Sequence, residues 1–344
     1  MEQISPSSDR SRYAKLSKEE RLHAFMRTIA HPHFVATSKA LQNAIQETGG
    51  ASLVFVCGPA GVGKTAVKNH VTSYAAAEML QASRRVGKRG HIPSLFARPS
   101  LNGSFSWRDF LLNVHAAFDP LVDQKNAFDA ENNERVKHLA HPGEFLPKFE
   151  HRKRTNNGAL RTSLESLYKQ YRPVAIIIDD SQHLGKMSSE WQLQNQLDCI
   201  KSLADITETV HILICTYELL ALRNVSAQIL RRSTIIHFPR YRSTDEEISQ
   251  FKGVLSAFQD LLPFEEETGI LLKHWEYCYE RSLGCVGILH DMLLRAVHTA
   301  LWADEKTLSE EYLKRHALSE EDCCVMMREI YEGERCIAFH QKMP

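Results

Sequence analysis

The stretch LVFVCGPAGVGKT, from Leu53 to Thr65, decides the fold of this chain. Its first five residues are all apolar, and the residues after them are rich in glycine, a pattern typical of a strand that is buried on both faces of a parallel sheet. Helical spacing then begins at Thr65 and continues to Leu80. The stretch therefore predicts a buried strand, a glycine-rich turn and a helix in immediate succession.

The glycine-rich turn fits the pattern GxxxxGK[ST] at every defined position, in the strand-to-helix context that this pattern requires. Such a P-loop surrounds a phosphate with backbone N–H groups, and the helix directs its positive N-terminus toward the anion. We expect Lys64 to reach the β and γ phosphates of ATP and the Thr65 hydroxyl to coordinate Mg²⁺. The candidate ATP-binding residues are Gly58, Pro59, Ala60, Gly61, Val62, Gly63, Lys64 and Thr65.

Strand signals recur at four further places. They are strong at residues 174–179 (VAIIID) and 210–216 (VHILICT), and weaker at residues 92–98 and 234–238. Segments of helical period separate the strands, and this alternation predicts an α/β fold with a doubly wound parallel sheet. The helical segments lie at residues 22–29, 38–47, 65–80, 106–118, 158–171, 188–206 and 225–231.

The pattern also predicts how the chain divides into domains. Residues 119–155 are charged and longer than an ordinary connection, which indicates an insertion or a mobile loop. After Ser243 strand signals cease and amphipathic helices follow one another. We expect an N-terminal extension at residues 1–33, a nucleotide-binding core at 34–240, a helical lid at 241–318 and a C-terminal tail at 319–344.

Two consecutive carboxylates, Asp179 and Asp180, stand where the strand at residues 174–179 ends. Asp179 comes directly after four apolar residues, at the end of the strand where α/β sheets bind ligands, and we expect it to hold Mg²⁺ together with Thr65. Asp180 is the candidate for polarising the water that attacks the γ-phosphate. The alternative is that Asp180 only caps the next turn.

Three further residues are candidates for the catalytic step. Thr216 ends the strand at residues 210–216, and its hydroxyl would lie beside the γ-phosphate if that strand runs between the other two strong strands. Arg231 and Arg232 close a helix just before the last strand, where an arginine would stabilise the charge on the γ-phosphate of a neighbouring subunit. The alternative for this pair is two cations favoured by a helix C-terminus.

Composition excludes several classes of protein. Lys and Arg (42) balance Asp and Glu (42), which excludes a histone-like protein bound to DNA through its overall charge. No apolar run approaches the roughly 20 residues needed to cross a bilayer, and the N-terminus lacks the apolar core of a signal peptide. Eight cysteines in 344 residues are too few for a disulfide scaffold. We expect a cytoplasmic protein with no membrane partner.

Five segments together resemble the TniB/TnsC family of AAA+ ATPases from bacterial transposons. They are GPAGVGKT, IIIDDSQHL, ICTYELLAL, QILRRSTIIHFPRY and SLGCVGILHDMLLRA, and the match runs from about residue 34 to residue 301. The resemblance implies a bacterial ATPase that forms a ring or filament of identical subunits on double-stranded DNA and connects a target-selection protein to the transposase subunits. Two alternatives remain open: a helicase-loader or replication-initiator-like remodeller of a protein partner, and a signalling NTPase that does not bind DNA.

The sequence departs from this family at two positions. Asp180 stands where relatives usually carry Glu, which predicts slow hydrolysis without loss of nucleotide binding. Ile288 stands where relatives often place an arginine that senses the nucleotide, so His290 and Arg295 are the remaining candidates for a second sensor.

Basic residues gather in two runs of this otherwise neutral chain. One run spans residues 84–89 and the other spans residues 151–154. The second run lies just before the helix that leads to Asp179. The family resemblance places pore-facing loops at this point, so it favours the second run. We expect Arg152, Lys153 and Arg154 to contact phosphates of DNA, largely without regard to base sequence.

Overall fold

The computed structural model describes residues 13, 15–46, 53–73, 94–96, 106–132, 156–185, 190–219, 233–266 and 268–342. The chain divides into two compact units. The helical unit contains Met1–Thr37, Gly58–Val67 and His237–Pro344, and the sheet unit contains Ser38–Cys57 and Lys68–Ile236. The predicted domain limits at residues 33, 240 and 318 stay a prediction.

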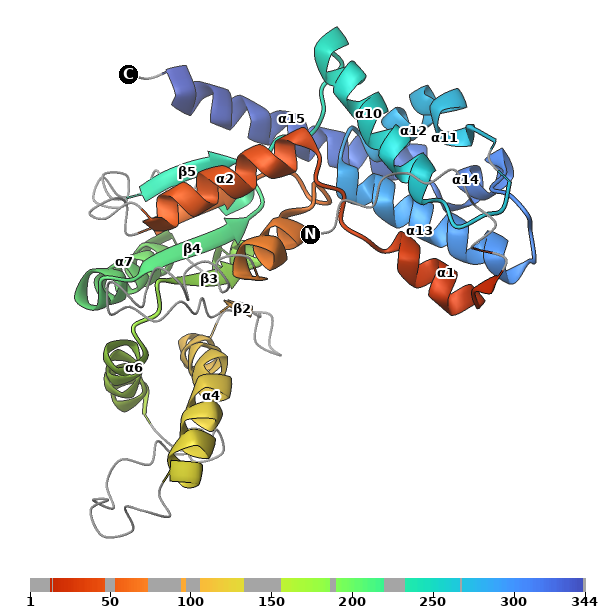
Figure 1. Ribbon diagram of the computed structural model, residues 1–344. Helices are drawn as coiled ribbons and strands as arrows, with labels where there is room; N and C mark the ends of the chain where they lie inside the picture. The colour runs from red at the N-terminus through yellow and green to blue at the C-terminus, as the bar shows by residue number, and fades with distance from the viewer. Residues whose placement is uncertain are drawn as a thin grey trace. The chain divides into compact units, whose positions relative to one another are not determined.

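In the part of the chain that the structure describes, five strands form one sheet in the order β2-β3-β4-β1-β5 (Figure 1). The pairs β1 with β4, β3 with β4 and β2 with β3 are parallel, so the predicted parallel sheet is confirmed. β4 lies between β1 and β3, which is the arrangement that the prediction for Thr216 required. The strands are β1 (Leu53–Cys57), β2 (Ser94–Phe96), β3 (Ala175–Asp179), β4 (Val210–Cys215) and β5 (Ser233–His237).

Burial explains why the central strands were readable from sequence. Every residue of β1 and of β3 is buried, and so is every residue of β4 after Val210. A strand that is covered on both faces has no solvent side, so its apolar residues run on without alternation. The polar His211 is accommodated within β4 because its ring shares hydrogen bonds with the Tyr168 hydroxyl and the Thr209 carbonyl oxygen, both at 3.0 Å.

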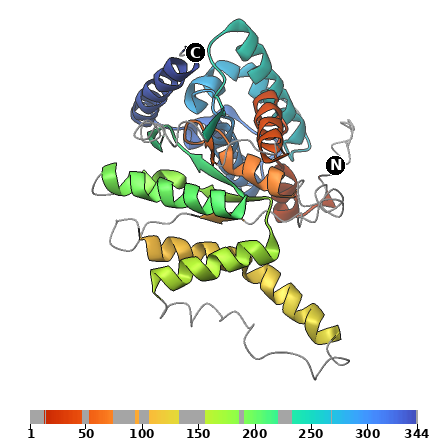
Figure 2. The ribbon, with the colours of Figure 1, turned by 90° about the vertical axis from the view of Figure 1, so that its left-hand side faces the viewer.

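Among the described residues, the long helices that lie wholly within the sheet unit are α4 (Trp107–Asn132), α6 (Asn157–Tyr171) and α7 (Glu190–Thr207). α4 packs against α6 and β2, and α7 packs against β4; Figure 2 shows α4 and α6 side by side. The prediction that the ordered helix ends at Phe118 was wrong, because α4 continues through Pro120 to Asn132. The apolar period stops at Phe118, but a helical backbone does not need it to continue.

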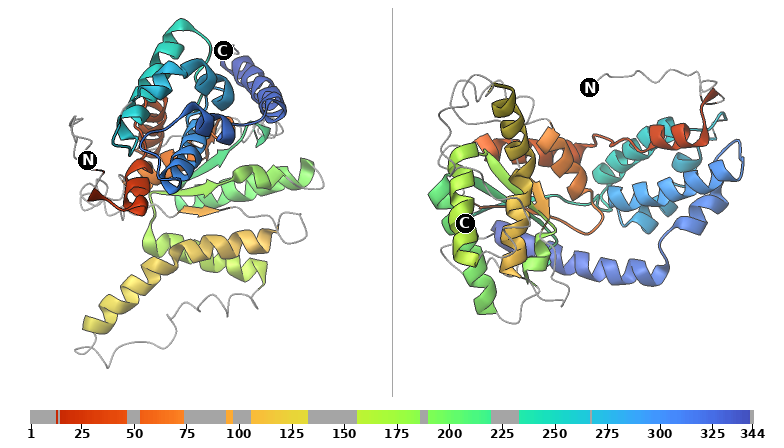
Figure 3. Two further views of the ribbon diagram at one scale, coloured as in Figure 1. Left: turned by 90° about the vertical axis from the view of Figure 1, so that its right-hand side faces the viewer. Right: turned by 90° about the horizontal axis from the view of Figure 1, so that it is seen from below.

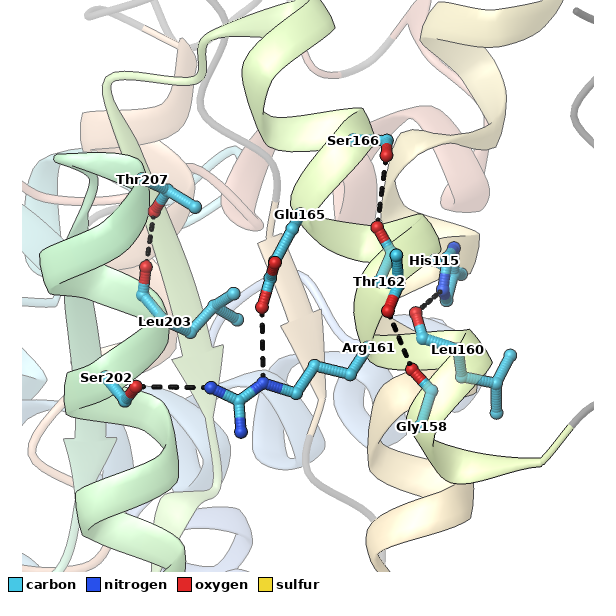
Figure 4. A network of polar contacts seen from close by, with 10 residues as sticks. All are labelled: His115, Gly158, Leu160, Arg161, Thr162, Glu165, Ser166, Ser202, Leu203 and Thr207. Atoms are coloured by element: carbon cyan, nitrogen blue, oxygen red, sulfur yellow. Dashed lines mark hydrogen bonds and ion pairs between the residues drawn. The ribbon is translucent and has the colours of Figure 1, made fainter.

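Polar contacts connect these helices to one another. The His115 ring on α4 contacts the Leu160 carbonyl oxygen at 3.0 Å, and Arg161 on α6 donates to the Ser202 hydroxyl on α7 at 3.2 Å. Arg161 also donates to Glu165, one turn further along α6, at 3.3 Å, as Figure 4 shows. α6 therefore has polar contacts with α4 on one side and with α7 on the other.

Helices make up most of the helical unit (Figure 3), and the succession of helices predicted after Ser243 is confirmed. Their core centres on α13, which buries nine residues. Arg240 holds the last helix through two contacts with the Glu334 carboxylate, at 3.0 and 3.4 Å. The helices after β5 are α10 (Asp245–Leu261), α11 (Ile270–Lys273), α12 (Trp275–Ser282), α13 (Val286–Trp302), α14 (Glu310–His316) and α15 (Glu320–Lys342).

Two helices near the N-terminus begin earlier than predicted. α1 (Lys18–Phe25) begins after Ser17, whose side chain accepts the N–H of Glu20 in a capping box. α2 (Pro32–Gln46) begins with a proline, which is favoured at the first helical position because no N–H is needed there. Among the helices of the described residues, none has the length and the apolar character required to cross a membrane.

Candidate nucleotide site

The P-loop belongs to the helical unit and has the backbone that its glycines permit. Gly61 and Gly63 have φ angles of +72° and +107°, which residues with a side chain rarely adopt. A helix over residues 64–73 follows at once. The N–H groups of Ala66 and Val67 both donate to the Gly63 carbonyl oxygen, at 3.0 and 3.2 Å. The helix N-terminus therefore begins inside the glycine-rich turn, the geometry that binds anions.

Lys64 directs its charge at this turn. Its Nζ donates hydrogen bonds to the carbonyl oxygens of Gly58, at 2.9 Å, and of Pro59, at 2.7 Å. The ammonium group is thus held over the loop by neutral acceptors. A phosphate is a stronger acceptor for an ammonium than a carbonyl is, because the hydrogen bond is then formed between two charged groups.

The start of α13 packs directly on the P-loop, within the same unit. The N–H of Ile288 donates to the Gly61 carbonyl oxygen at 2.9 Å. A Cβ atom added to Gly287 would lie 2.4 Å from that oxygen and 3.3 Å from the nitrogen of Gly63. Ile288 therefore contacts the loop through its backbone, although the arginine that the family resemblance predicted is missing at this position.

A cavity of about 140 Å³ lies beside the loop in the helical unit. Its size is close to that of the roughly 150 Å³ cavity known to hold one benzene ring, so it suits a single flat ring system rather than a whole nucleotide. Of the two candidates for a second sensor, His290 lines this cavity, whereas Arg295 donates to the His316 carbonyl oxygen at 3.5 Å. The lining residues are Met26, Arg27, Thr28, Ile29, His31, Phe34, Val62, Gly63, Ala66, Phe258, Val286, Gly287 and His290.

One wall of this cavity carries a histidine that stays neutral. Burial, with a smaller contribution from His33, lowers the pKa of His31 to about 4. Its Nδ1 shares a hydrogen bond of 3.0 Å with the Tyr241 hydroxyl, and burial raises the pKa of Tyr241 to about 12. Neither group is charged at neutral pH, so this part of the wall suits an uncharged ring, and the cation among the lining residues is Arg27.

The carboxylate of Asp179 lies in the sheet unit, at the end of β3, and is 97% buried. Its Oδ1 accepts the N–H of Asp180 at 3.0 Å, and its Oδ2 lies 2.9 Å from Nζ of Lys68, whose side chain is 95% buried. A carboxylate at this edge is the hard oxygen ligand that Mg²⁺ prefers, so Asp179 fits its predicted role. Lys68 was not singled out from sequence, although a lysine between the buried Val67 and Val71 is an unusual residue.

Asp180 directly follows β3, and Thr216 directly follows the adjacent parallel strand β4. Both residues therefore lie at the same edge of the sheet. Asp180 is exposed, has a φ of +52° and accepts a hydrogen bond from the Gln182 side chain at 3.2 Å. The Thr216 hydroxyl oxygen is buried and has no hydrogen-bond partner among the described residues. A buried hydroxyl without a partner costs free energy, which an acceptor on a ligand would offset.

Several predicted site residues lie outside the described residues. They are Arg231 and Arg232, the candidates for acting on a neighbouring subunit, and Arg152, Lys153 and Arg154, the candidates for DNA contact. The basic run at residues 84–89 also lies outside them. The roles of all these residues stay predictions.

Comparisons with known proteins agree with this geometry. A sequence profile of the family described as AAA domain matches residues 46–222, whereas no curated protein sequence matches the chain. Among solved structures, the ORC2 protein of Aeropyrum pernix in its ADPNP-ADP complexes superposes with a TM-score of 0.51 at 13% identity, over 86% of this chain and 72% of that one. A Walker-type ATPase of Pyrococcus abyssi superposes with a TM-score of 0.50 at 13% identity, over 91% of this chain and 79% of that one. The predicted fold class, a parallel sheet flanked by helices and followed by C-terminal helices, is confirmed.

Proposed function

This chain belongs to the AAA domain family and has the AAA+ P-loop NTPase fold, and on that premise we propose that it is a Mg²⁺-dependent ATPase. The observation that carries the proposal is the loop from Gly58 to Thr65 with the cavity beside it. The turn offers backbone N–H groups and the Lys64 ammonium to phosphates, and the cavity has room for one flat ring beside the neutral His31. The Walker-type ATPase of Pyrococcus abyssi has a similar fold.

In this proposal, Gly58, Pro59, Ala60, Gly61, Val62 and Gly63 supply the phosphate loop, and Lys64 binds the β and γ phosphates. Thr65 and Asp179 would hold Mg²⁺, which offsets the negative charge of the phosphates. Asp180 orients the attacking water as a base. The Thr216 hydroxyl, which has no partner among the described residues, donates a hydrogen bond to a γ-phosphate oxygen. Arg231 or Arg232 acts on the nucleotide of a neighbouring subunit.

The biological role that we propose is the regulation of DNA transposition. The support is the ordered resemblance of five segments to the TniB/TnsC family, which includes the sequence around Asp179 and the start of α13. In this role the protein assembles on double-stranded DNA with ATP, through Arg152, Lys153 and Arg154 of each subunit, and connects a target-selection protein to the transposase. We retain the predicted division into an N-terminal extension, a core, a lid and a tail.

The alternative is a helicase-loader or replication-initiator-like remodeller of a protein partner. The fold shared with the Aeropyrum pernix ORC2 protein is compatible with either role. A protein of either kind would hydrolyse ATP and oligomerise, so the assay must determine whether the oligomer forms on duplex DNA. A protein that regulates transposition in this way assembles along plain duplex DNA without a helicase.

The test is electron microscopy and gel retardation of the purified chain with unrelated duplex sequences, in the presence of ATP, of a non-hydrolysable ATP analogue or of no nucleotide. We expect ordered assemblies with both nucleotides and none without. Assembly with ATP in the absence of DNA, together with no retardation of any duplex, favours the alternative. Lys64→Ala is the control, because it removes the cation on the phosphates and leaves the proposed DNA-contacting residues in place.

A further inference from the structure

The buried ion pair between Lys68 and Asp179 is the feature that the proposed ATPase mechanism does not use. Nζ and Oδ2 lie 2.9 Å apart, and the two side chains are 5% and 3% exposed. The flanking side chains of Val71 and Ile178 are fully buried. An ammonium or a carboxylate in such surroundings is retained only when it is paired, because each loses its water on folding.

The two oxygens of Asp179 have different neighbours, and among the described residues only Oδ1 accepts a hydrogen bond, whereas Oδ2 forms an ion pair without hydrogen-bond geometry. Oδ1 accepts a backbone N–H from Asp180, which the turn after β3 fixes in place. Oδ2 contacts the end of a four-carbon side chain with several rotatable bonds. The lysine contact is therefore the one that a metal ion is able to replace.

A divalent cation at Asp179 does not find a ready-made cage. Within the part of the chain that the structure describes, no three His, Cys, Asp or Glu side chains gather in a way that could hold a metal. Mg²⁺ is usually bound through one or two carboxylates, and its other ligands are waters and the phosphates of the substrate. The missing ligands and the missing negative charge must then arrive with the nucleotide.

We propose that Lys68 is an internal counterion that takes the place of the divalent cation on Asp179 until the nucleotide binds, so that Mg²⁺ enters this site only together with ATP. The proposal rests on the proposed role of Asp179 as the Mg²⁺ ligand. Without nucleotide, an added dication would share one carboxylate with an ammonium, and the two positive charges repel each other. The phosphates of ATP supply the negative charge that offsets the repulsion between the Lys68 ammonium and Mg²⁺.

Lys68 is in this account a positioning residue, because it acts on the nucleotide through Asp179. Its charge should also matter more than its shape. An arginine at residue 68 keeps the charge and should preserve the exclusion of free metal, whereas a glutamine keeps a hydrogen-bond donor and removes the charge.

The test measures binding of Mn²⁺, as a spectroscopic probe for Mg²⁺, to the nucleotide-free protein by electron paramagnetic resonance. We expect Lys68→Gln to bind Mn²⁺ about tenfold or more tightly than the unchanged protein, because a unit positive charge beside the site is lost. Lys68→Arg should bind as weakly as the unchanged protein. The double variant Lys68→Gln/Asp179→Asn should lose the gain, which assigns it to this carboxylate.

Thermal unfolding without nucleotide gives a second readout. Removing one partner of a buried ion pair is destabilising, so Lys68→Gln should melt below the unchanged protein in metal-free buffer. Added Mg²⁺ should raise its melting temperature toward that of the unchanged protein, and NaCl at matched ionic strength should not. The unchanged protein should respond to Mg²⁺ only after a non-hydrolysable ATP analogue is present.

Two results would overturn the proposal. One is tight Mn²⁺ binding by the unchanged protein without nucleotide, equal to that with the analogue, which decides the matter even if Lys68→Gln does not fold. The other is a folded Lys68→Gln whose Mn²⁺ affinity and response to Mg²⁺ match those of the unchanged protein. A failure of the proposed ATPase function looks different, since the chain would then bind no nucleotide while the metal responses of Lys68→Gln persisted.

Discussion

The backbone N–H of Ile288 donates a hydrogen bond to the carbonyl oxygen of Gly61, at 2.9 Å. This bond joins the first turn of α13 to the centre of the P-loop, inside the helical unit. Gly287 makes the approach close enough, since its missing side chain leaves room for the Gly61 carbonyl group. The P-loop is therefore in direct backbone contact with α13, which forms the centre of the helical core.

The first prediction concerns Gly287→Ala. The new Cβ would lie 2.4 Å from a backbone oxygen of the loop, so the loop or the helix must shift. We expect nucleotide affinity to fall about tenfold or more, because the cavity wall and the phosphate loop both move, and fluorescence titration with a labelled ATP measures it.

The matched control is Gly253→Ala, on α10, where an added Cβ meets nothing within 4 Å. It should leave the affinity unchanged and stabilise the protein by about 0.5 to 1 kcal/mol, because alanine is the better helix former. Equal effects of the two substitutions on nucleotide binding would remove the role assigned to the contact between Gly287 and Gly61.

The second prediction concerns Asp180→Asn. The amide keeps the size of the side chain, tolerates the left-handed backbone at φ +52°, and loses the charge that orients a water. We expect ATP and DNA binding to persist while the rate of hydrolysis falls about 100-fold, as measured by phosphate release. Asp180→Glu should hydrolyse ATP faster than the unchanged chain. Unaltered turnover in Asp180→Asn would leave Asp180 as a cap of the turn.

The third prediction concerns acid pH and His31. Its pKa is lowered from 6.5 to about 4 by burial, so the unfolded chain binds a proton more readily between these values and the folded state loses stability as the pH falls through this range. Between pH 7.5 and pH 5, His31 alone should lower the free energy of unfolding by on the order of 2 kcal/mol.

Urea unfolding of His31→Phe checks the sign of this effect. The variant should lose less stability on acidification than the unchanged protein does, because phenylalanine takes up no proton. His23→Phe, at an exposed position of α1, is the control. A fall in stability that is the same for His31→Phe and the unchanged protein would show that other groups govern the acid response.

The fourth prediction concerns DNA. Replacing Lys153 and Arg154 with Ala should weaken binding about equally on unrelated duplexes, because phosphate contacts do not read the bases. The slope of log affinity against log salt should flatten by about one for each DNA phosphate that a subunit no longer neutralises, with ATP binding unchanged. If only a change in the basic run at residues 84–89 flattens the slope, the DNA contact has been assigned to the wrong segment.

The sheet and the P-loop were predictable because buried parallel strands and phosphate loops leave local patterns. β1 has the bounds that its apolar run predicted, and β3 and β4 each differ by one residue at one end. Helix ends were less accessible where a cap or a first-turn proline decides them, as at Ser17 and Pro32. The second half of α4 was missed because its sequence lacks an apolar period.

The contacts that carry the site were harder to predict, because they join residues far apart in the chain. The hydrogen bond from Ile288 to Gly61 involves only backbone atoms, so the identity of the side chains does not predict it. Lys68 left a weak signal as a charged residue in an apolar segment, but its partner Asp179 lies on another element. Motif spacing identifies which residues are able to bind a nucleotide, and tertiary structure decides what they contact before it arrives.

The most direct test of the central claim is the binding of labelled ATP, with Mg²⁺, to the unchanged chain and to Lys64→Ala. The variant loses the charge-assisted hydrogen bonds from the ammonium to the phosphates, so its affinity should fall about 100-fold or more. Lys314→Ala, which removes an exposed cation of α14, should bind as the unchanged chain does. Near-normal affinity in Lys64→Ala, with the protein folded, would contradict the assignment of residues 58–65 as the ATP site.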